Sequence, residues 1–378
     1  MLQLHKLKQA FLFLFISLYL LMGLASCFHS VEKTSPKNNG LNHIHLPIDS
    51  IDSNSYIGHK VYFDGVDHIL IQNNEIIMNR YSARNLDDIT ESYYPGAPVF
   101  ARGQVGVKIR LKTNSRNVRF RVSQRRDGLD IPLKDLRLVV FENGVLSQSY
   151  TSQLDIQYEV KLKADTNLIE LYLPSLYGIN LKNIQIDSGS STFTDQSSDS
   201  TLVIIGDSNA AGYANTQATN NQLWGDYLSR LKGWNLYNLG LVGSQVSMLV
   251  THSLGFKKID QVLIMYGTNS YHMQMELEKF RFLYAELLES INEYQPTSEI
   301  ICITPIAFNL NIQERHIDPI DYTLEDYRII IREECNKTNQ ASVFEGGQLI
   351  NIHKLADDQV HISPSLHDDF ARWINDHI

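Results

Sequence analysis

Residues 201–213 read TLVIIGDSNAAGY, an unbroken apolar run that ends at Gly206 and is followed at once by Asp-Ser-Asn and two alanines. Such a run, rich in β-branched residues, is typical of a strand buried on both faces of a parallel sheet. Open α/β sheets bind ligands at the carboxyl ends of their strands, so the pattern predicts that Ser208 faces a ligand site. Serine is also a common helix N-cap, and Ser208 could instead cap a helix that begins near Ala210.

Strand and helix patterns alternate from this point to the end of the chain. Apolar runs at NLYNLG, QVLIMYG, EIICITP and ASVFEGG predict further strands, and the stretches between them carry apolar residues at helical spacing. We therefore predict an α/β domain over residues 201–378, with a parallel sheet that helices cover on both faces.

A different pattern precedes this domain. Between residues 55 and 187 the periodicity is two, as in VRFRV at 118–122, whose apolar residues share one face. The pair Asn143-Gly144 between two such runs is a hairpin signal. Short alternating strands without a convincing helix predict an all-β sandwich or jelly-roll domain over residues 55–187. The polar stretch at 188–200 predicts a linker.

The later strand ends of the α/β domain deliver more groups that suit catalysis. These are Gly243 in YNLGLVGS, Asn269 in MYGTNS, and Asp358 with His361 in DDQVHISPS. Together with GDSN at 206–209, they resemble in order and spacing the four sequence blocks of the SGNH, or GDSL-like, hydrolase superfamily. The resemblance covers about 175 residues and implies a flavodoxin-like three-layer α/β fold and a serine hydrolase.

Two positions depart from the family pattern. Asn209 stands where many members have Leu, and Ser270 follows Asn269 where many have Asp. Neither position holds a catalytic group in the family pattern. A non-catalytic descendant of the family remains the alternative.

The chemistry of Ser208 can be argued without the family. A serine hydroxyl is a poor nucleophile until an imidazole removes its proton, and His361 is the candidate base. Asp358 lies three residues before His361 and could hold the other ring nitrogen. His353 and His367 are competing histidines, for which we expect a surface or capping role.

An ester carbonyl attacked by serine gathers negative charge, which fixed donors must meet. The resemblance implies that the backbone N–H groups of Ser208 and Gly243 and the side-chain amide of Asn269 form this oxyanion hole. Asn269 could also be a turn-forming residue after its strand. Asp207 is expected to support the turn before Ser208 and not to act as a second nucleophile.

The N-terminus has the pattern of an export signal. Residues 1–26 carry Lys6 and Lys8 and then a charge-free apolar stretch that ends in small residues before Cys27. Leu-Ala-Ser-Cys resembles the lipobox of bacterial lipoproteins, which implies lipidation of Cys27, a polar tether at 27–54 and a membrane anchor. An uncleaved signal anchor is the alternative, because the apolar stretch falls just short of the ~20 residues that span a bilayer. An Asp directly after the cysteine would resemble an inner-membrane retention signal of Gram-negative lipoproteins, and Phe28 stands there instead. This favours the outer membrane, and the sequence does not decide between its periplasmic face and its surface face.

The composition and charge of the chain limit which kinds of partner it can bind. The net charge is −9, and no stretch clusters Lys and Arg with aromatic residues, so we expect no nucleic-acid partner. Cys302 and Cys335 are expected to be core thiols. His43 and His45 lack a third metal ligand nearby, so we expect them to be surface residues and not a metal site. A serine mechanism needs no metal, and no stretch resembles a Gly-rich phosphate loop, so we expect no cofactor.

These features predict an extracytoplasmic, lipid-anchored serine esterase. An N-terminal β-sandwich before an SGNH domain resembles the architecture of some carbohydrate esterases, which implies that the protein removes small acyl groups, such as acetyl, from carbohydrate. A lipase or thioesterase, an acyltransferase acting on glycan, and a glycan-binding lipoprotein without activity are the alternatives. Residues 306–322 are long enough to form a wall or lid of the substrate site.

Overall fold

The structure is a computed structural model, and one compact unit contains all the residues that it describes. The predictions for the leader, Cys27, the tether, His43, His45 and His353 lie outside these residues, as does most of the segment 306–322. No helix within the described residues is long and apolar enough to span a bilayer. The described residues are 60–73, 75–90, 93–94, 96–128, 137–151, 154–163, 165–195, 198–213, 219–255, 258–307, 321–350 and 354–378.

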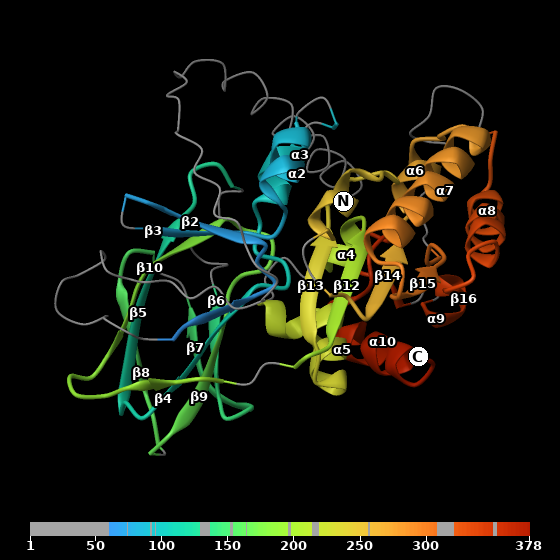
Figure 1. The fold of residues 1–378 in the computed structure, drawn as a ribbon. Coiled ribbons are helices and arrows are strands. Elements are labelled where there is room, and N and C mark those ends of the chain that lie inside the picture. The colour runs from blue at the N-terminus through green and yellow to red at the C-terminus, as the bar shows by residue number, and fades with distance from the viewer. Residues whose placement is uncertain are drawn as a thin grey trace, which may run out of the picture. The chain divides into compact units, whose positions relative to one another are not determined.

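A five-stranded parallel sheet forms the centre of the C-terminal part (Figure 1). Its strands are β12 (Thr201–Gly206), β13 (Asn235–Gly240), β14 (Gln261–Met265), β15 (Glu299–Ile303) and β16 (Ala341–Phe344). They lie in the order β13-β12-β14-β15-β16, so β13 is an edge strand and β12 lies between β13 and β14. All five coincide with the apolar runs of the sequence, and the prediction of a parallel sheet is confirmed.

Helices follow these strands. The longer ones are α5 (Trp224–Lys232), α7 (Leu277–Tyr294), α8 (Leu324–Asn336) and α10 (His367–Asn375). Short helices are α4 (Ser208–Ala211), α6 (Thr268–His272) and α9 (Gly346–Leu349), with 3₁₀ turns η2 (Asn220–Gln222), η3 (Leu249–Ser253) and η6 (Pro364–Leu366). Local signals set several ends: Thr323 and Asp326 form a capping box before α8, and Gly212 and Gly233 end α4 and α5 in left-handed conformation.

Both faces of the parallel sheet are covered, as predicted for an α/β domain. Val203 and Ile205 of β12 belong to a core that includes the buried side chains of α7 and α8. Leu202 and Ile204 belong to a second core with α5 and α10. Successive residues of a strand point to opposite faces, so one apolar run packs into both layers.

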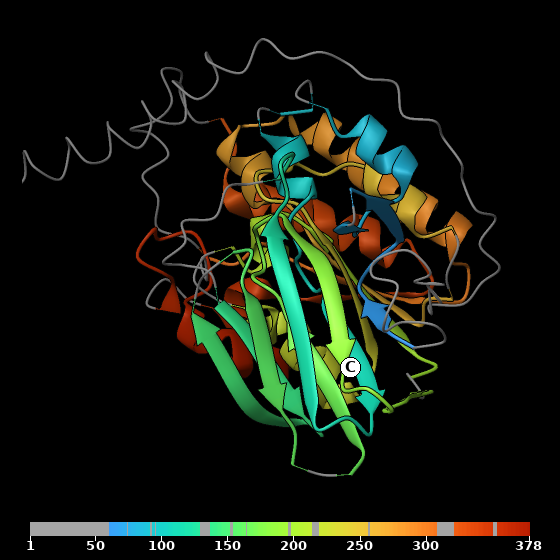
Figure 2. The same cartoon turned by 90° about the vertical axis from the view of Figure 1, so that its left-hand side faces the viewer.

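The N-terminal part contains two antiparallel sheets, as predicted for the β domain (Figure 2). Its strands are β1 (Tyr62–Asp64), β2 (His68–Gln72), β3 (Glu75–Asn79), β4 (Lys108–Thr113), β5 (Asn117–Gln124), β6 (Arg137–Glu142), β7 (Val145–Thr151), β8 (Gln157–Lys161), β9 (Asn167–Tyr172), β10 (Ile179–Ile186) and β11 (Thr192–Phe193). One sheet has the order β1-β4-β9-β6-β7 with β11 beside β4, and the other has the order β2-β3-β10-β5-β8.

The pattern of period two places side chains in this part as expected. Val118, Phe120 and Val122 of β5 are all buried in the core of the two sheets. Asn143 and Gly144 both have positive φ and join β6 to β7 in a hairpin. Strand β11 lies in the stretch predicted as a linker, and the exact domain limits stay predictions.

The sequence predicts no helix between residues 55 and 187, and this is wrong at two places. Helix α2 (Ala83–Asp88) is capped by the Ser82 side chain, and α3 (Ala97–Ala101) begins after Gly96 with a proline in its first turn. Helices of five or six residues are too short to show an amphipathic period, which explains why the pattern missed them.

The prediction that Cys302 and Cys335 are core thiols is also wrong, because the two form a disulfide. Cys302 lies on β15 and Cys335 on α8, and both are fully buried with their Cα atoms 6.6 Å apart. Helix α8 packs against β15, and this brings together two residues 33 positions apart in the sequence. The spacing of two isolated cysteines does not reveal such a pairing.

Candidate active site

Ser208 lies at the carboxyl end of β12, the position that the apolar run predicted. Gly206 ends the strand, and a Cβ atom there would lie 2.3 Å from the Met265 carbonyl oxygen, so only glycine fits. Asp207 is the N-cap of α4, and its Oδ1 accepts a hydrogen bond from the Asn209 N–H at 2.9 Å. Asp207 therefore supports the turn, as expected, and Ser208 is the first helical residue and not the cap.

A chain of hydrogen bonds joins Ser208 to two residues far along the sequence. The Oγ of Ser208 lies 2.8 Å from Nε2 of His361, and Nδ1 of His361 lies 2.6 Å from Oδ2 of Asp358. Asp358 Oδ1 accepts the backbone N–H groups of Val360 and His361, each at 3.0 Å, which fixes the short turn between the two residues. The structure thus brings together the three residues predicted as nucleophile, base and carboxylate.

The charge of Asp358 sets the proton positions in this chain. Partial burial would raise the pKa of the Asp358 carboxyl, but the hydrogen bond and charge of His361 outweigh it and hold the pKa at about 2. An ionised carboxylate only accepts, so Nδ1 of His361 carries a proton toward Asp358. Nε2 of the neutral ring is then free to accept the proton of the Ser208 hydroxyl.

Tyr213 lies beside the hydrogen-bonded residues Ser208, His361 and Asp358, and the sequence patterns did not predict this. Its ring centroid lies 4.9 Å from that of His361, at an interplanar angle of 51°. Burial raises the pKa of Tyr213, and the charge of Asp358 adds to the effect. Gly212 turns the backbone with φ of 72° directly before Tyr213, and this glycine after the small residues was the available signal.

Of the predicted oxyanion donors, Ser208 begins α4, Asn269 lies in α6, and Gly243 lies on a loop that is tied to the end of β12. The N–H of Leu241 donates to the Gly206 carbonyl at 2.9 Å, just before Ser208. Gly243 has φ of 83°, a conformation that favours glycine. Asn269, in α6, donates its Nδ2 to the Ser244 carbonyl at 2.9 Å, and this bond uses one of the two amide protons.

Of the two competing histidines, only His367 lies within the described residues. It begins α10, as expected, but it is buried, so a surface role is wrong. Its Nδ1 accepts the N–H of Trp224 at 3.2 Å, and it thereby caps α5 from another helix. Burial lowers the pKa of His367 to about 4.

Asp207 is a second buried ionisable group beside the site. Burial raises the pKa of Asp207 to about 6, although the Asn209 N–H and the charge of His361 act in the opposite direction.

No metal-binding group of three or more His, Cys, Asp or Glu side chains gathers within the described ranges.

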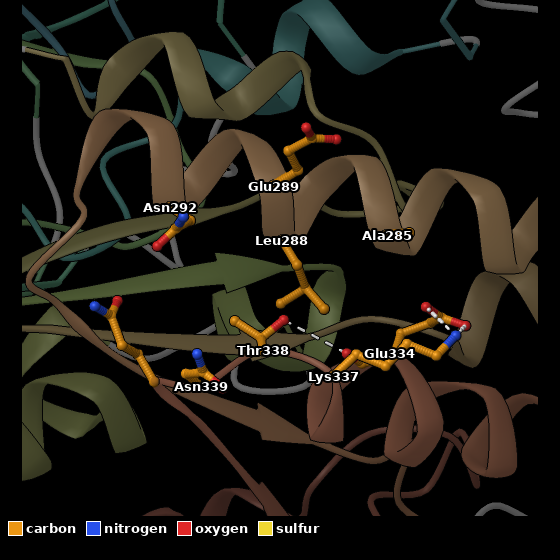
Figure 3. Close-up of a pocket in the computed structure, with 9 residues that line it drawn as sticks. Ala285, Leu288, Glu289, Asn292, Glu334, Lys337, Thr338 and Asn339 are labelled. Carbon is orange, nitrogen blue, oxygen red and sulfur yellow. Dashed lines mark hydrogen bonds and ion pairs between the residues drawn. The ribbon is translucent and has the colours of Figure 1, made fainter.

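A polar hollow lies elsewhere in the α/β part, between α7 and the end of α8 (Figure 3). Leu288, Glu289, Glu334 and Thr338 are among its lining residues, and none of the predicted site residues belongs to it. The Glu334 carboxylate is already bonded to Lys337 and to Arg281. This hollow is therefore distinct from the candidate active site.

A three-layer α/β fold, with serine after its first strand and Asp-x-x-His before its last helix, defines the SGNH class of hydrolase. Residues 204–368 match the model of the GDSL-like Lipase/Acylhydrolase family, and this part of the chain is a GDSL-like domain of an ester hydrolase. A comparison with curated protein sequences found no match.

Solved structures with this fold extend over most of the chain. A salicylyl-acyltransferase from a tetracycline biosynthetic pathway is similar with a TM-score of 0.71 and 18% identity, covering 82% of this chain and 92% of that one. A putative GDSL-like lipase from Bacteroides ovatus has a TM-score of 0.62, 16% identity and coverage of 84% and 94%. A family two carbohydrate esterase from Clostridium thermocellum, in complex with cellohexaose, has a TM-score of 0.57, 14% identity and coverage of 73% and 92%.

Proposed function

We propose that the protein is an extracytoplasmic serine esterase that removes small acyl groups, acetyl above all, from carbohydrate. The observation that carries the proposal is the continuous hydrogen-bonded chain from Ser208 through His361 to Asp358. This arrangement supplies an activated hydroxyl, a base and an orienting carboxylate in one place.

In the proposed reaction, the Ser208 oxygen attacks the ester carbonyl carbon while Nε2 of His361 takes the hydroxyl proton. Asp358 stabilises the imidazolium that forms. The N–H groups of Ser208 and Gly243 and the Asn269 amide hold the negative charge on the carbonyl oxygen. The C–O bond to the sugar then breaks, and His361 protonates the departing alcohol. Water repeats these steps on the acyl-enzyme and releases the carboxylic acid.

The substrate class is supported by the whole architecture. The carbohydrate esterase bound to cellohexaose matches 73% of this chain, so the likeness extends beyond the residues that match the family model. Small acyl groups suit a nucleophile that is 5% exposed and is followed, after Asn209, by two buried alanines. We expect deacetylation of polysaccharide as the physiological reaction.

A fluorophosphonate probe tests the proposed nucleophile, since it reacts with activated serine and releases fluoride. We expect the wild type to be labelled and Ser208→Ala not to be labelled. Persistent labelling of Ser208→Ala would remove Ser208 from the mechanism, and an unreactive wild type would favour a glycan-binding protein. Rates on p-nitrophenyl esters from acetate to decanoate, and acetate release from acetylated xylan, then separate a deacetylase from a lipase or thioesterase.

Acyl transfer is the second candidate, and a specific observation favours it. The acyltransferase has a higher TM-score to this chain than the carbohydrate esterase does. Transfer would use the same acyl-enzyme, with a sugar hydroxyl in place of water. If an added glycan acceptor accelerates turnover while acetate release falls, transfer is the correct function.

We propose further that the mature protein is lipidated at Cys27 and anchored in a bacterial envelope, on the outer membrane. The lipobox-like sequence supports this location, and a buried disulfide fits an oxidising compartment. Cys27→Ser should move the protein from the membrane fraction to the soluble fraction without loss of esterase activity, because several acyl chains are needed for stable attachment. An unchanged membrane fraction would indicate an uncleaved signal anchor.

A further inference from the structure

The loop over residues 241–245, here called the oxyanion loop, follows the edge strand β13 and carries Gly243. Its own hydrogen bonds are few: the Ser244 N–H donates to the Leu241 carbonyl at 3.1 Å, and the Ser244 hydroxyl donates to the same carbonyl at 2.8 Å. A loop held so lightly from within needs external contacts to keep one backbone conformation.

Besides the bonds to Gly206 and from Asn269 described above, such contacts come from two tyrosines about 150 residues earlier in the chain. Tyr93 and Tyr94 lie in the chain between α2 and α3. The Tyr94 hydroxyl donates to the Val242 carbonyl, and the Tyr93 hydroxyl donates to the Gln245 carbonyl at 3.1 Å. The Tyr94 ring also lies against Gly243, where a Cβ atom would be 3.0 Å from its Cε2.

The strand that leads into the loop is fixed from the same segment. Arg80 is 1% exposed and donates from Nη1 to the Asn238 carbonyl at 2.5 Å and to the Gly240 carbonyl at 3.3 Å. The Tyr81 hydroxyl donates to the Leu239 carbonyl at 2.9 Å. Because β13 is an edge strand and its backbone groups alternate in direction, the Asn238 and Gly240 carbonyls face away from β12, and Arg80 satisfies them.

The bond from Tyr94 differs from the others in where it falls on the backbone. The Val242 carbonyl belongs to the same peptide unit as the Gly243 N–H. A peptide unit is planar and trans, so its C=O and N–H point in opposite directions, and a donor that fixes the C=O also fixes the N–H. A hydrogen bond to the carbonyl also polarises the amide and strengthens its N–H as a donor.

We propose that Tyr94 is a positioning residue for ester cleavage, which orients and polarises the Val242–Gly243 peptide so that the Gly243 N–H meets the oxyanion. The inference rests on the proposed esterase function. Tyr93 serves as the internal contrast, because the Gln245 carbonyl shares its peptide with the N–H of Val246, which is not an oxyanion donor. The N-terminal part of the chain thereby contributes to the rate through the backbone of another region.

Tyr94→Phe removes the hydroxyl and keeps the ring that packs on Gly243. We expect kcat on p-nitrophenyl acetate to fall about three- to tenfold, as for the loss of one neutral hydrogen bond, while KM changes less than twofold. The affinity for a boronic acid, which forms an anionic tetrahedral adduct with Ser208, should weaken by the same factor. Tyr93→Phe is the matched control and should keep kcat within twofold.

The outcomes separate this inference from the function on which it rests. A wild type that neither cleaves the ester nor binds the boronic acid overturns the esterase function. Activity that depends on Ser208 but is unchanged in Tyr94→Phe overturns only the role of Tyr94. Equal losses of kcat in Tyr93→Phe and Tyr94→Phe also overturn it, because they would indicate general support of the loop and not orientation of one peptide.

Discussion

The two sides of the candidate active site are built in different ways. Ser208, His361 and Asp358 lie within the GDSL-like part and hold one another through their own side chains. The oxyanion loop also receives hydrogen bonds from Tyr93 and Tyr94, and the strand before it receives them from Arg80; these three residues precede that part. Proton transfer needs particular side chains, whereas a backbone N–H needs only support, which many residue types can supply. The sequence motifs therefore reveal the catalytic side chains and the position of Gly243, but not the residues that support the loop around Gly243.

The largest expected effects concern the side that the motifs revealed. His361→Ala removes the base, and we expect kcat to fall about 10⁶-fold, leaving what binding and the oxyanion donors supply. Asp358→Ala leaves an imidazole that is less well oriented, and the loss should be about a hundredfold smaller. Single-turnover and steady-state rates on an acetyl ester measure both.

Two outcomes would change this side of the comparison. If His361→Ala keeps most of the wild-type rate, His353 becomes the better base, since Nδ1 of buried His367 already accepts the Trp224 N–H. If Asp358→Ala is as active as the wild type, another neighbour orients the imidazole, and the adjacent ring of Tyr213 is the first candidate.

The next largest effect tests the donor side. Asn269→Ala removes one proposed oxyanion donor and the bond to Ser244, and we expect kcat to fall about 10²- to 10³-fold with little change in KM. Gln274→Ala is the matched control, because its amide bonds to the Tyr271 and Tyr322 carbonyls at the other end of α6. A loss of KM alone would place Asn269 in substrate binding and not in the oxyanion hole.

Sequence alone predicted the parallel sheet, both antiparallel sheets and the residues now joined by hydrogen bonds at Ser208. Long apolar runs and alternating runs bury whole faces, so their signal is strong. The sequence did not predict the helices α2 and α3. It also did not predict that the segment between them contacts the oxyanion loop, because the hydrogen bonds from Tyr93 and Tyr94 depend on the tertiary structure. The disulfide escaped for the same reason, since α8 meets β15 only in the fold.

Removing the disulfide should destabilise the α/β part without changing the residues of the active site. We expect Cys302→Ala combined with Cys335→Ala to lower the free energy of unfolding by about 2–4 kcal/mol, because the bridge closes a loop of 33 residues in the unfolded chain. Activity at 25 °C should stay close to that of the wild type. Urea unfolding of the two proteins in a Cys27→Ser background measures the difference, and free thiols titrated in the denatured, unreduced Cys27→Ser protein would contradict the pairing.

The last expected effect concerns His367, which lies near His361 in the sequence, and the change that its titration causes in the free energy of unfolding at acidic pH. His367 caps α5 through Trp224, and its environment includes the backbone of Ile362, directly after His361. Its pKa is about 4 in the folded protein against about 6.5 in the unfolded chain, so only the unfolded chain takes up the proton between these values. This lowers the free energy of unfolding as the pH falls from about 6.5 to 4, by about 2–4 kcal/mol in total.

His367→Asn keeps an acceptor for the Trp224 N–H but cannot titrate. We expect it to be less stable than the wild type at pH 7.5, because it leaves a small cavity, and to lose less stability on acidification. The raised pKa of Asp207, about 6, acts in the opposite sense, since the folded protein binds that proton first as the pH falls. Burial also raises the pKa of Asp226 to about 6. The wild-type curve therefore mixes several groups, and the difference between the two proteins isolates His367. Urea unfolding from pH 7.5 to 4.5 measures it. If the difference in free energy of unfolding does not change with pH, His367 caps α5 but does not contribute to the acid sensitivity of the protein.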